Sequence, residues 1–242
     1  MSVLIDLDDY LGEVEAFAEL ANDFVDKSSA LRLTDIVREL KTGIDLGQSE
    51  WSWETKKDIV FRPSQLYDGP GRRHIDTWLK LGFRCEFVRP KQVKKAKTIW
   101  NIATTATHVE IYKNDGRMPC HFDYKNDRQW GPQLHFQVSE SIGNLPIPRI
   151  LSMSFLPTDC ADLLLAELHH EEWRRLQAAG SSSRHVSVIR DAQEHRTKAY
   201  IENIANLWHG DKKSTRICML QNYTATVEAL PNCRGRSAVR PW

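Results

Sequence analysis

The alternation of apolar and polar side chains over residues 74–138 is the feature that most constrains the fold of this chain. In the segment FRCEFV, at 83–88, Phe and Cys alternate with charged residues, which is the pattern of a strand with one buried and one solvated face. A second alternating run begins at Trp100 and continues through THVEIY, and turn sequences follow at 114–116 and 126–132. Because alternating residues flank each turn, we predict an antiparallel meander of three strands.

Helical patterns flank this stretch on both sides. Residues 4–26 carry apolar side chains at steps of three and four, and a shorter helix is expected to begin at an N-cap at Thr34 and to end before Gly43. Toward the C-terminus we predict a helix over 158–179 and a long helix over about 184–208. The expected fold is therefore α+β, with N-terminal helices, a central antiparallel β-meander and two long C-terminal helices packed on the sheet.

Length and composition suit one soluble domain. The chain has 242 residues, and the Gly- and Pro-rich loop at 67–73 is the one candidate sub-boundary within a single domain over 1–242. Lys and Arg total 33 and Asp and Glu 32, so the net charge indicates neither a nucleic acid nor an acidic partner. No apolar run reaches the roughly 18–20 residues of a membrane span, the N-terminus lacks a basic signal region, and five scattered cysteines favour reduced thiols. We expect a cytoplasmic protein without a membrane segment.

A cluster of titratable side chains is expected on the polar face of the meander. Because alternate residues share a face, His121, Asp123 and His135 lie on the same side of the sheet. A loop that is symmetric about Arg128 places His121 opposite His135. The same symmetry places Asp123 opposite Gln133.

The preceding strand adds His108 and Glu110 to this face. A turn centred near 115–116 places Glu110 beside His121, and it places His108 beside Asp123. Directly opposite Cβ atoms lie about 4.5–5.5 Å apart, which is close enough for hydrogen bonding or shared metal ligation. The candidate catalytic residues are His108, Glu110, His121, Asp123 and His135.

Two chemical functions fit this cluster, and so does a structural one. Imidazoles and carboxylates on a rigid sheet can hold a divalent metal. Without a metal, Asp123 can orient a histidine for general acid–base catalysis. Gln137 stands where a third histidine would strengthen a metal site, so the sequence leaves the metal and any other cofactor undecided. A solvated sheet face also carries His, Asp and Gln as ordinary residues, and a register slip of one residue would disperse the cluster.

The basic run RPKQVKKAK at 89–97 is a second candidate site. Its cations can contact nucleic-acid phosphates, with Trp100 as a nearby stacking surface, and a charged surface loop explains the same residues equally simply. The candidate nucleic-acid-binding residues are Arg89, Lys91, Lys94, Lys95 and Lys97.

No established catalytic motif accompanies these candidates. The chain has no P-loop, no GxGxxG, no GxSxG and no local signature of a cysteine nucleophile. The helix segment LHHEEWRR contains His and Glu but lacks the second histidine of HExxH. The sequence therefore leaves open whether the protein is an enzyme.

The segment FDYKNDRQWGPQLHFQV, followed by LPIPR and a leucine-rich helix, resembles a pattern in small bacterial proteins. Those proteins look like components of toxin–antitoxin or phage-defence gene clusters. The resemblance covers about residues 107–175 and implies no established activity, so no catalytic residue is transferred from it.

Two functions are therefore expected. The first, which the resemblance implies, is a component of a bacterial defence or conflict system that acts by binding a partner protein or another copy of itself. The alternative is a metal-dependent or His/Asp acid–base hydrolase or nuclease that uses the polar face of residues 107–138. Nucleic acid is a further candidate partner through the basic run at 89–97.

Overall fold

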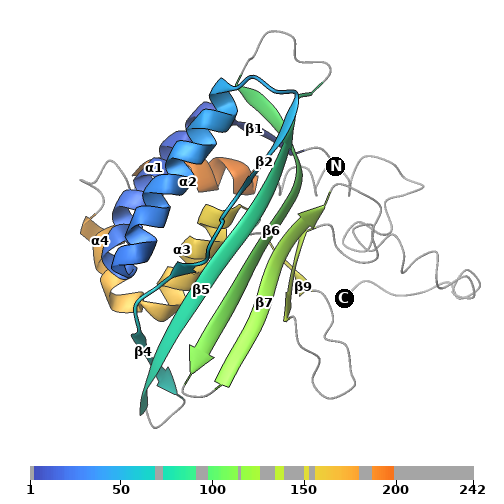
Figure 1. Cartoon of the computed structure of the whole chain (residues 1–242). Coiled ribbons are helices and arrows are strands. Elements are labelled where there is room, and N and C mark those ends of the chain that lie inside the picture. Colours follow the sequence, from blue (N-terminus) through green and yellow to red (C-terminus); the bar gives the residue numbers. More distant parts are fainter. Residues whose placement is uncertain are drawn as a thin grey trace, which may run out of the picture.

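The computed structural model describes residues 3–68, 73–90, 98–113, 116–125, 134–138, 150–152, 156–179 and 187–198. These residues form an α+β fold in which helices cover one face of a nine-stranded sheet, as Figure 1 shows. Every strand pair in the sheet is antiparallel. The fold class predicted from the alternation and the flanking helical patterns is confirmed.

Four consecutive strands form the centre of the sheet. They are β5 (Arg73–Val88), β6 (Ile99–Lys113), β7 (Gly116–Lys125) and β8 (Leu134–Val138). The shorter strands are β1 (Val3–Asp6), β2 (Glu50–Glu54), β3 (Ile59–Val60), β4 (Ser64–Asp68) and β9 (Ile150–Leu151). The order is β2-β5-β6-β7-β8-β9, with β3 and β4 also paired to β5 and β1 paired to β6. The three strands predicted around the two turns correspond to β6, β7 and β8, and the strand predicted at 83–88 is part of β5.

The helices form a layer against one face of this sheet (Figure 1). They are α1 (Leu7–Ala21), the short 3-10 helix η1 (Asn22–Phe24), α2 (Lys27–Asp45), α3 (Pro157–Leu168), α4 (His170–Ala179) and a helix at residues 187–198. Alternate residues of β5, from Leu79 through Leu81 and Phe83 to Cys85, are at most 3 % exposed and form the floor of the core. Burial of these side chains against the helices supplies the main driving force for folding.

Capping residues set the starts of the first two helices, and both starts differ from the predictions. The helix expected over 4–26 begins at Leu7, because Asp6 accepts hydrogen bonds from the N–H groups of the first turn and residues 3–6 pair with β6. The helix expected from Thr34 begins at Lys27, because the Asp26 carboxylate accepts the Ser29 N–H at 2.6 Å. Asp is among the best N-cap residues, so the helix begins directly after Asp26 and not after Thr34.

The helix predicted over 158–179 is two helices that meet at His169. This residue leaves helical geometry, and its ring is buried edge-on against Phe24 at a centroid distance of 5.1 Å. Trp173 packs on the same phenylalanine at 5.6 Å. Of the second helix expected, over 184–208, residues 187–198 are helical and the remainder lies outside the described residues. The break between the two helices therefore lies where His169 and Trp173 both pack on Phe24.

A buried ion cluster joins the two ends of the described chain. Glu13 of α1 has no solvent exposure, and it accepts hydrogen bonds from the Arg196 guanidinium and from the Thr158 hydroxyl at 2.7 Å. Arg196 also pairs with Asp159 at the start of α3. Burial raises the pKa of Glu13 and the arginine opposes that rise. The helix at 187–198 is thereby fixed against α1 and α3.

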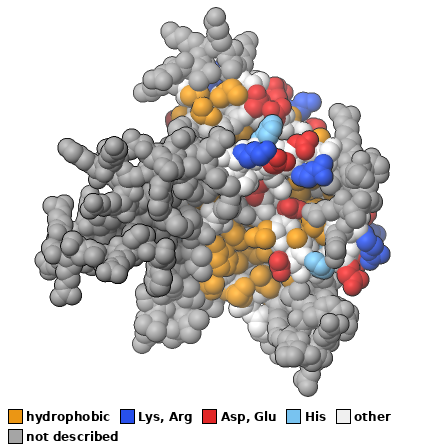
Figure 2. Space-filling view, turned by 180° about the vertical axis from the view of Figure 1, so that it is seen from behind, with side chains coloured by type: hydrophobic (Ala, Val, Ile, Leu, Met, Phe, Trp, Pro, Cys, Tyr) orange, Lys and Arg blue, Asp and Glu red, His pale blue; other side chains and the backbone are white. Residues whose placement is uncertain are grey.

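The outer surface mixes charges of both signs. On the face in Figure 2, which is seen from behind relative to Figure 1, acidic and basic side chains are interspersed around a hydrophobic patch. None of the described helices is long and apolar enough to cross a membrane.

Candidate functional site

The face of the sheet opposite the helices carries the candidate site. On β5 the buried side chains alternate with those of Trp78, Lys80 and Arg84, which therefore point to the other face. The register extends this face across β6, β7 and β8 in rows of directly opposed residues. Among the described residues, all helices lie on the other side of the sheet (Figure 1).

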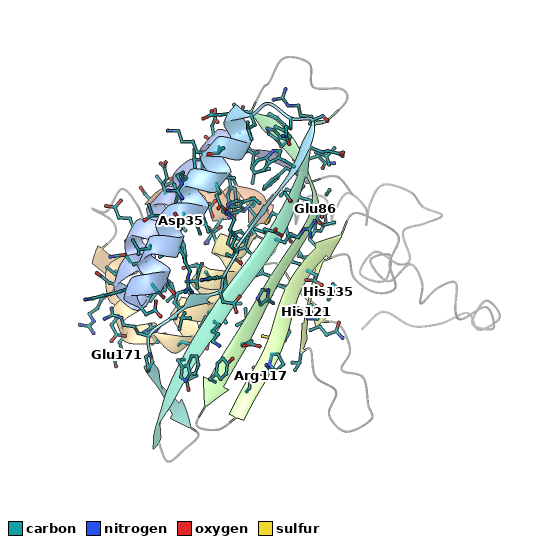
Figure 3. All side chains as sticks on the ribbon, in the orientation of Figure 1. Asp35, Glu86, Arg117, His121, His135 and Glu171 are labelled. Carbon is teal, nitrogen blue, oxygen red and sulfur yellow. The ribbon has the colours of Figure 1, made fainter. Side chains whose placement is uncertain are left out.

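Three of the predicted residues converge on this face. Asp123 of β7 lies directly opposite His135 of β8, and His121 is two residues away on the same strand. The Asp123 Oδ2 atom is 3.6 Å from His121 Nε2 and 4.0 Å from His135 Nε2. The two imidazole rings meet edge to face at 5.8 Å between centroids. Figure 3 shows both histidines next to each other on neighbouring strands. We call His121, Asp123 and His135 the His–Asp–His triad.

The sequence correctly predicts that the three triad residues share one face of the sheet, but it predicts the wrong cross-strand partners for them. His121 is opposite Gln137 rather than His135, and Asp123 is opposite His135 rather than Gln133. The β7–β8 hairpin is centred on Gln129, so each pairing shifts by two residues. An even shift keeps every side chain on its face. The triad therefore forms despite the wrong register.

The first hairpin is shifted in the same way. Lys113 pairs with Gly116, so only residues 114 and 115 connect β6 to β7. His108 is consequently opposite His121 rather than Asp123. Two-residue connections are the commonest in hairpins, and Gly116 becomes the first residue of β7 instead of part of the turn.

His108 lies beside the triad and has a carboxylate of its own. Its Nε2 is 3.0 Å from Oδ1 of Asp58, which lies just before β3. Gly82 of β5 is opposite His108, and a Cβ at this glycine would lie 2.1 Å from the imidazole ring. The missing side chain leaves the space through which His108 reaches Asp58.

Glu110 is the one predicted residue that the structure engages elsewhere. It lies opposite Pro119 rather than His121. One carboxylate oxygen accepts the Tyr112 hydroxyl, and the other is 3.0 Å from Arg117 Nη1. Arg117 lies four residues before His121 and nearer the start of β7, as Figure 3 shows. Glu110 thus fixes a polar network near one end of the face.

The exposure of the triad is graded. The side chain of His135 is 2 % exposed, whereas those of His121 and Asp123 are 25 % and 21 % exposed. A ligand that reaches His121 and Asp123 from solvent therefore meets a third, buried imidazole beside them. The partial exposure of His121 and Asp123 supplies the access.

The donor set of the triad suits a divalent transition metal. One ligand atom from each residue can be chosen so that all lie within 4.8 Å of one another. Ligands of a tetrahedral zinc ion at about 2.1 Å lie about 3.4 Å apart, so small side-chain rotations are sufficient to bind. Two imidazoles and one carboxylate are also a known donor set for catalytic zinc and for Fe(II).

Cysteine nucleophiles are not favoured among the described residues. Cys85, Cys120 and Cys160 are all buried. Burial raises the pKa of the Cys120 thiol to about 11 and raises those of the other two further above the ordinary value. Since the thiolate is the reactive form, these side chains act as small apolar core residues.

The structure describes only the start of the basic run at 89–97. Arg89 lies over the ring of Trp100 with its guanidinium carbon 4.9 Å from the ring centroid. Trp100 has no solvent exposure, so the expectation that it offers a stacking surface is wrong. Lys91, Lys94, Lys95 and Lys97 lie outside the described residues.

Sequence reasoning missed Asp58 and Gly82. An isolated glycine inside a strand pattern is a recognised sign of close approach by another group, so Gly82 carried a usable signal. Asp58 carried none, because it reaches His108 only through the tertiary fold. Comparison with protein-family models, curated proteins and solved structures finds no match for this chain.

Proposed function

We propose that this protein is a metal-dependent hydrolase whose metal is held by His121, Asp123 and His135. The observation that carries the proposal is the convergence of two imidazoles and one carboxylate from neighbouring strands. Three protein ligands leave coordination positions open, which is the arrangement of catalytic rather than structural zinc sites. The partial exposure of His121 and Asp123 gives water and substrate a route to those positions.

His108 supplies the proton-transfer group in this proposal. Its place opposite His121 puts it next to the triad, and Asp58 holds its Nε2–H so that Nδ1 is left to accept a proton. A metal held by these three residues would activate a water molecule for attack at neutral pH. The water oxygen attacks the electrophilic centre, the bond to the leaving group breaks, and the proton passes by way of His108 to the leaving group. Asp58 stabilises the imidazolium formed in between.

Turnover of an activated phosphodiester tests the proposal. Purified protein is assayed with bis(4-nitrophenyl) phosphate after EDTA treatment and after separate addition of Zn²⁺, Mn²⁺ and Fe²⁺. We expect no activity without metal and recovery with at least one of the three ions. His121→Ala and Asp123→Ala should remain inactive with every metal. His170→Ala is the matched control, because this exposed imidazole on α4 lies outside the site. Metal-independent turnover, or full activity in the Asp123 variant, would contradict the proposal.

The binding role implied by the resemblance is a second proposal with its own test. A component of a defence system that acts through a protein partner should capture that partner from extract of its native host. It should do so regardless of the metal state of the triad. Stoichiometric metal in a protein that captures no partner would contradict the binding role and leave the hydrolase proposal standing.

A further inference from the structure

A stacked aromatic pair lies on the same face as the triad. Trp78 of β5 and Tyr112 of β6 are register partners, and their rings are parallel within 4° at a centroid distance of 4.0 Å. Both are half-buried, and alternation places them on the face opposite the helices. The described side chains of β5 on the core side are buried beneath the helices, so this pair is a separate feature from the core.

Two cations and one carboxylate lie near this pair, since Glu110 is the cross-strand partner of Lys80 and forms an ion pair with Arg117. The Lys80 ammonium is 5.6 Å from the centroid of Trp78 and 5.0 Å from that of Tyr112. Arg117 lies opposite Tyr112 on β7, and its guanidinium is fixed by Glu110, which also accepts the tyrosine hydroxyl. A cross-strand aromatic pair stabilises a sheet by itself. Cations arranged around it add the features of a surface that stacks bases and contacts phosphates.

The aromatic pair and the triad are offset both along the strands and across them, because the pair lies on β5 and β6 and the triad lies on β7 and β8. Tyr112 is opposite Arg117 of β7, and His121 and Asp123 lie four and six residues farther along that strand, which corresponds to about 14 and 20 Å. A stacked nucleic-acid strand advances about 3.4 Å per nucleotide, so about four to six nucleotides cover this distance. Lys80 lies two residues from Trp78 along β5, where a phosphate next to the stacked base would pass.

We infer that Trp78 and Tyr112 form a nucleobase platform and that single-stranded nucleic acid is the substrate of the triad. This inference rests on the proposed function and names its substrate class. One base stacks on the platform, Lys80 and Arg117 contact phosphates, and a phosphodiester a few nucleotides away reaches the triad. Hydrolysis there adds water across one P–O bond and requires no oxidant or reductant. A single strand is favoured over a duplex because its bases are free to stack on protein side chains.

Binding in EDTA tests the platform separately from catalysis. A fluorescein-labelled 12-nucleotide single-stranded DNA is titrated with protein, and fluorescence anisotropy gives Kd. Base–aromatic stacking contributes about 1–3 kcal/mol, so Trp78→Ala should raise Kd about 5- to 150-fold. Trp78→Leu, which keeps bulk without an aromatic face, should weaken binding similarly. Tyr112→Phe keeps the ring and should bind nearly as wild type. Thermal unfolding verifies that each variant is folded.

Salt dependence and a duplex competitor sharpen the test. Two phosphate contacts predict that log Kd rises by about 1.4 per tenfold increase in salt, and Lys80→Met should remove about 0.7 of that slope. The corresponding duplex should compete poorly for the labelled strand. The platform would be overturned if the Trp78→Leu variant bound the single strand with the wild-type Kd, or if the duplex bound more tightly than the single strand. Absence of single-strand binding at low salt would overturn it as well.

The two proposals fail in different ways. His121→Ala should bind the labelled strand as tightly as wild type and cleave none of it when metal is added. Cleavage by His121→Ala would contradict the triad and leave the platform intact. Metal-dependent turnover of the small phosphodiester without any binding of the single strand would contradict the platform and leave the triad intact.

Discussion

His108 and Asp58 are fifty residues apart in the sequence and 3.0 Å apart in the fold, because Gly82 leaves the space between them open. Both side chains are more than one third exposed, so this ion pair contributes little to stability. Its consequence is geometric: it fixes one ring nitrogen of a histidine that lies next to the triad.

Gly82→Ala should therefore separate stability from activity. The new Cβ displaces the His108 ring, whereas alanine in a strand interior removes the entropic cost of glycine, about 0.5–1 kcal/mol. We expect an unchanged or slightly higher unfolding temperature together with a kcat about 100-fold lower, the lower end of what general base catalysis contributes. Gly12→Ala, at a helical position with open space, is the control and should leave kcat unchanged. A Gly82→Ala variant with the wild-type kcat would show that His108 takes no part in the reaction.

Loss of Arg196 should destabilise the protein, and the size of the destabilisation should depend on pH. Arg196→Ala leaves the Glu13 carboxylate buried and unpaired, which costs about 3–5 kcal/mol. Burial raises the pKa of Glu13, and without the arginine the pKa rises further. A raised carboxyl pKa means that the folded state prefers the protonated form. The variant should therefore lose stability as pH rises through the ordinary Glu value of about 4.3 toward the raised value.

Urea unfolding at several pH values checks this expectation. The difference in unfolding free energy between wild type and Arg196→Ala should be larger at pH 7 than at pH 4.5. Arg190→Ala, which removes an exposed arginine of the same helix, should change stability little at either pH. A destabilisation that does not vary with pH would show that Glu13 is not the group left unpaired.

The Asp26 cap should carry a second, opposite pH dependence. Asp26→Ala should lower the free energy of unfolding by about 1 kcal/mol, and Asp26→Asn by much less, since Asn caps as well as Asp. The Ser29 N–H that Asp26 accepts lowers the carboxyl pKa. This contribution is therefore present above the ordinary Asp value and is lost as pH falls through the lowered one. Urea unfolding of the Asn variant should lack this acid loss, and equal acid sensitivity in both proteins would contradict the assignment.

The triad should respond to mutation as one unit. His121→Ala and His135→Ala should each abolish turnover, and the double variant should be no worse than either single variant, because members of one catalytic site are non-additive. His135 is buried, so its variant is compared at equal folded fraction. Rate losses that multiply in the double variant would indicate two independent roles.

The sequence predicted which face of the sheet a residue lies on better than it predicted which residues pair across the strands. Alternation has a period of two, and it correctly placed His121, Asp123 and His135 on one face of the sheet. Pairing depends on where each turn is centred, and the composition of the loops does not determine that. Both hairpins were consequently predicted two residues out of register. Glu110 was therefore expected beside His121, where the structure has His108.

Tertiary contacts set the features that local patterns missed. The break at His169 lies where its ring packs on Phe24, which is distant in sequence. Asp58 reaches the site only because β3 pairs with β5 beside Gly82. The apolar periodicity of residues 158–179 continues through the bend, so no local signal marks it.

Metal stoichiometry is the most direct test of the triad. Protein incubated with Zn²⁺ and dialysed against metal-free buffer is analysed by inductively coupled plasma mass spectrometry. We predict about one equivalent of zinc in wild type and in His170→Ala, and less than about one tenth of an equivalent in His121→Ala, Asp123→Ala and His135→Ala. Wild type without bound metal, or an Asp123→Ala variant that keeps a full equivalent, would contradict a metal centre at these three residues.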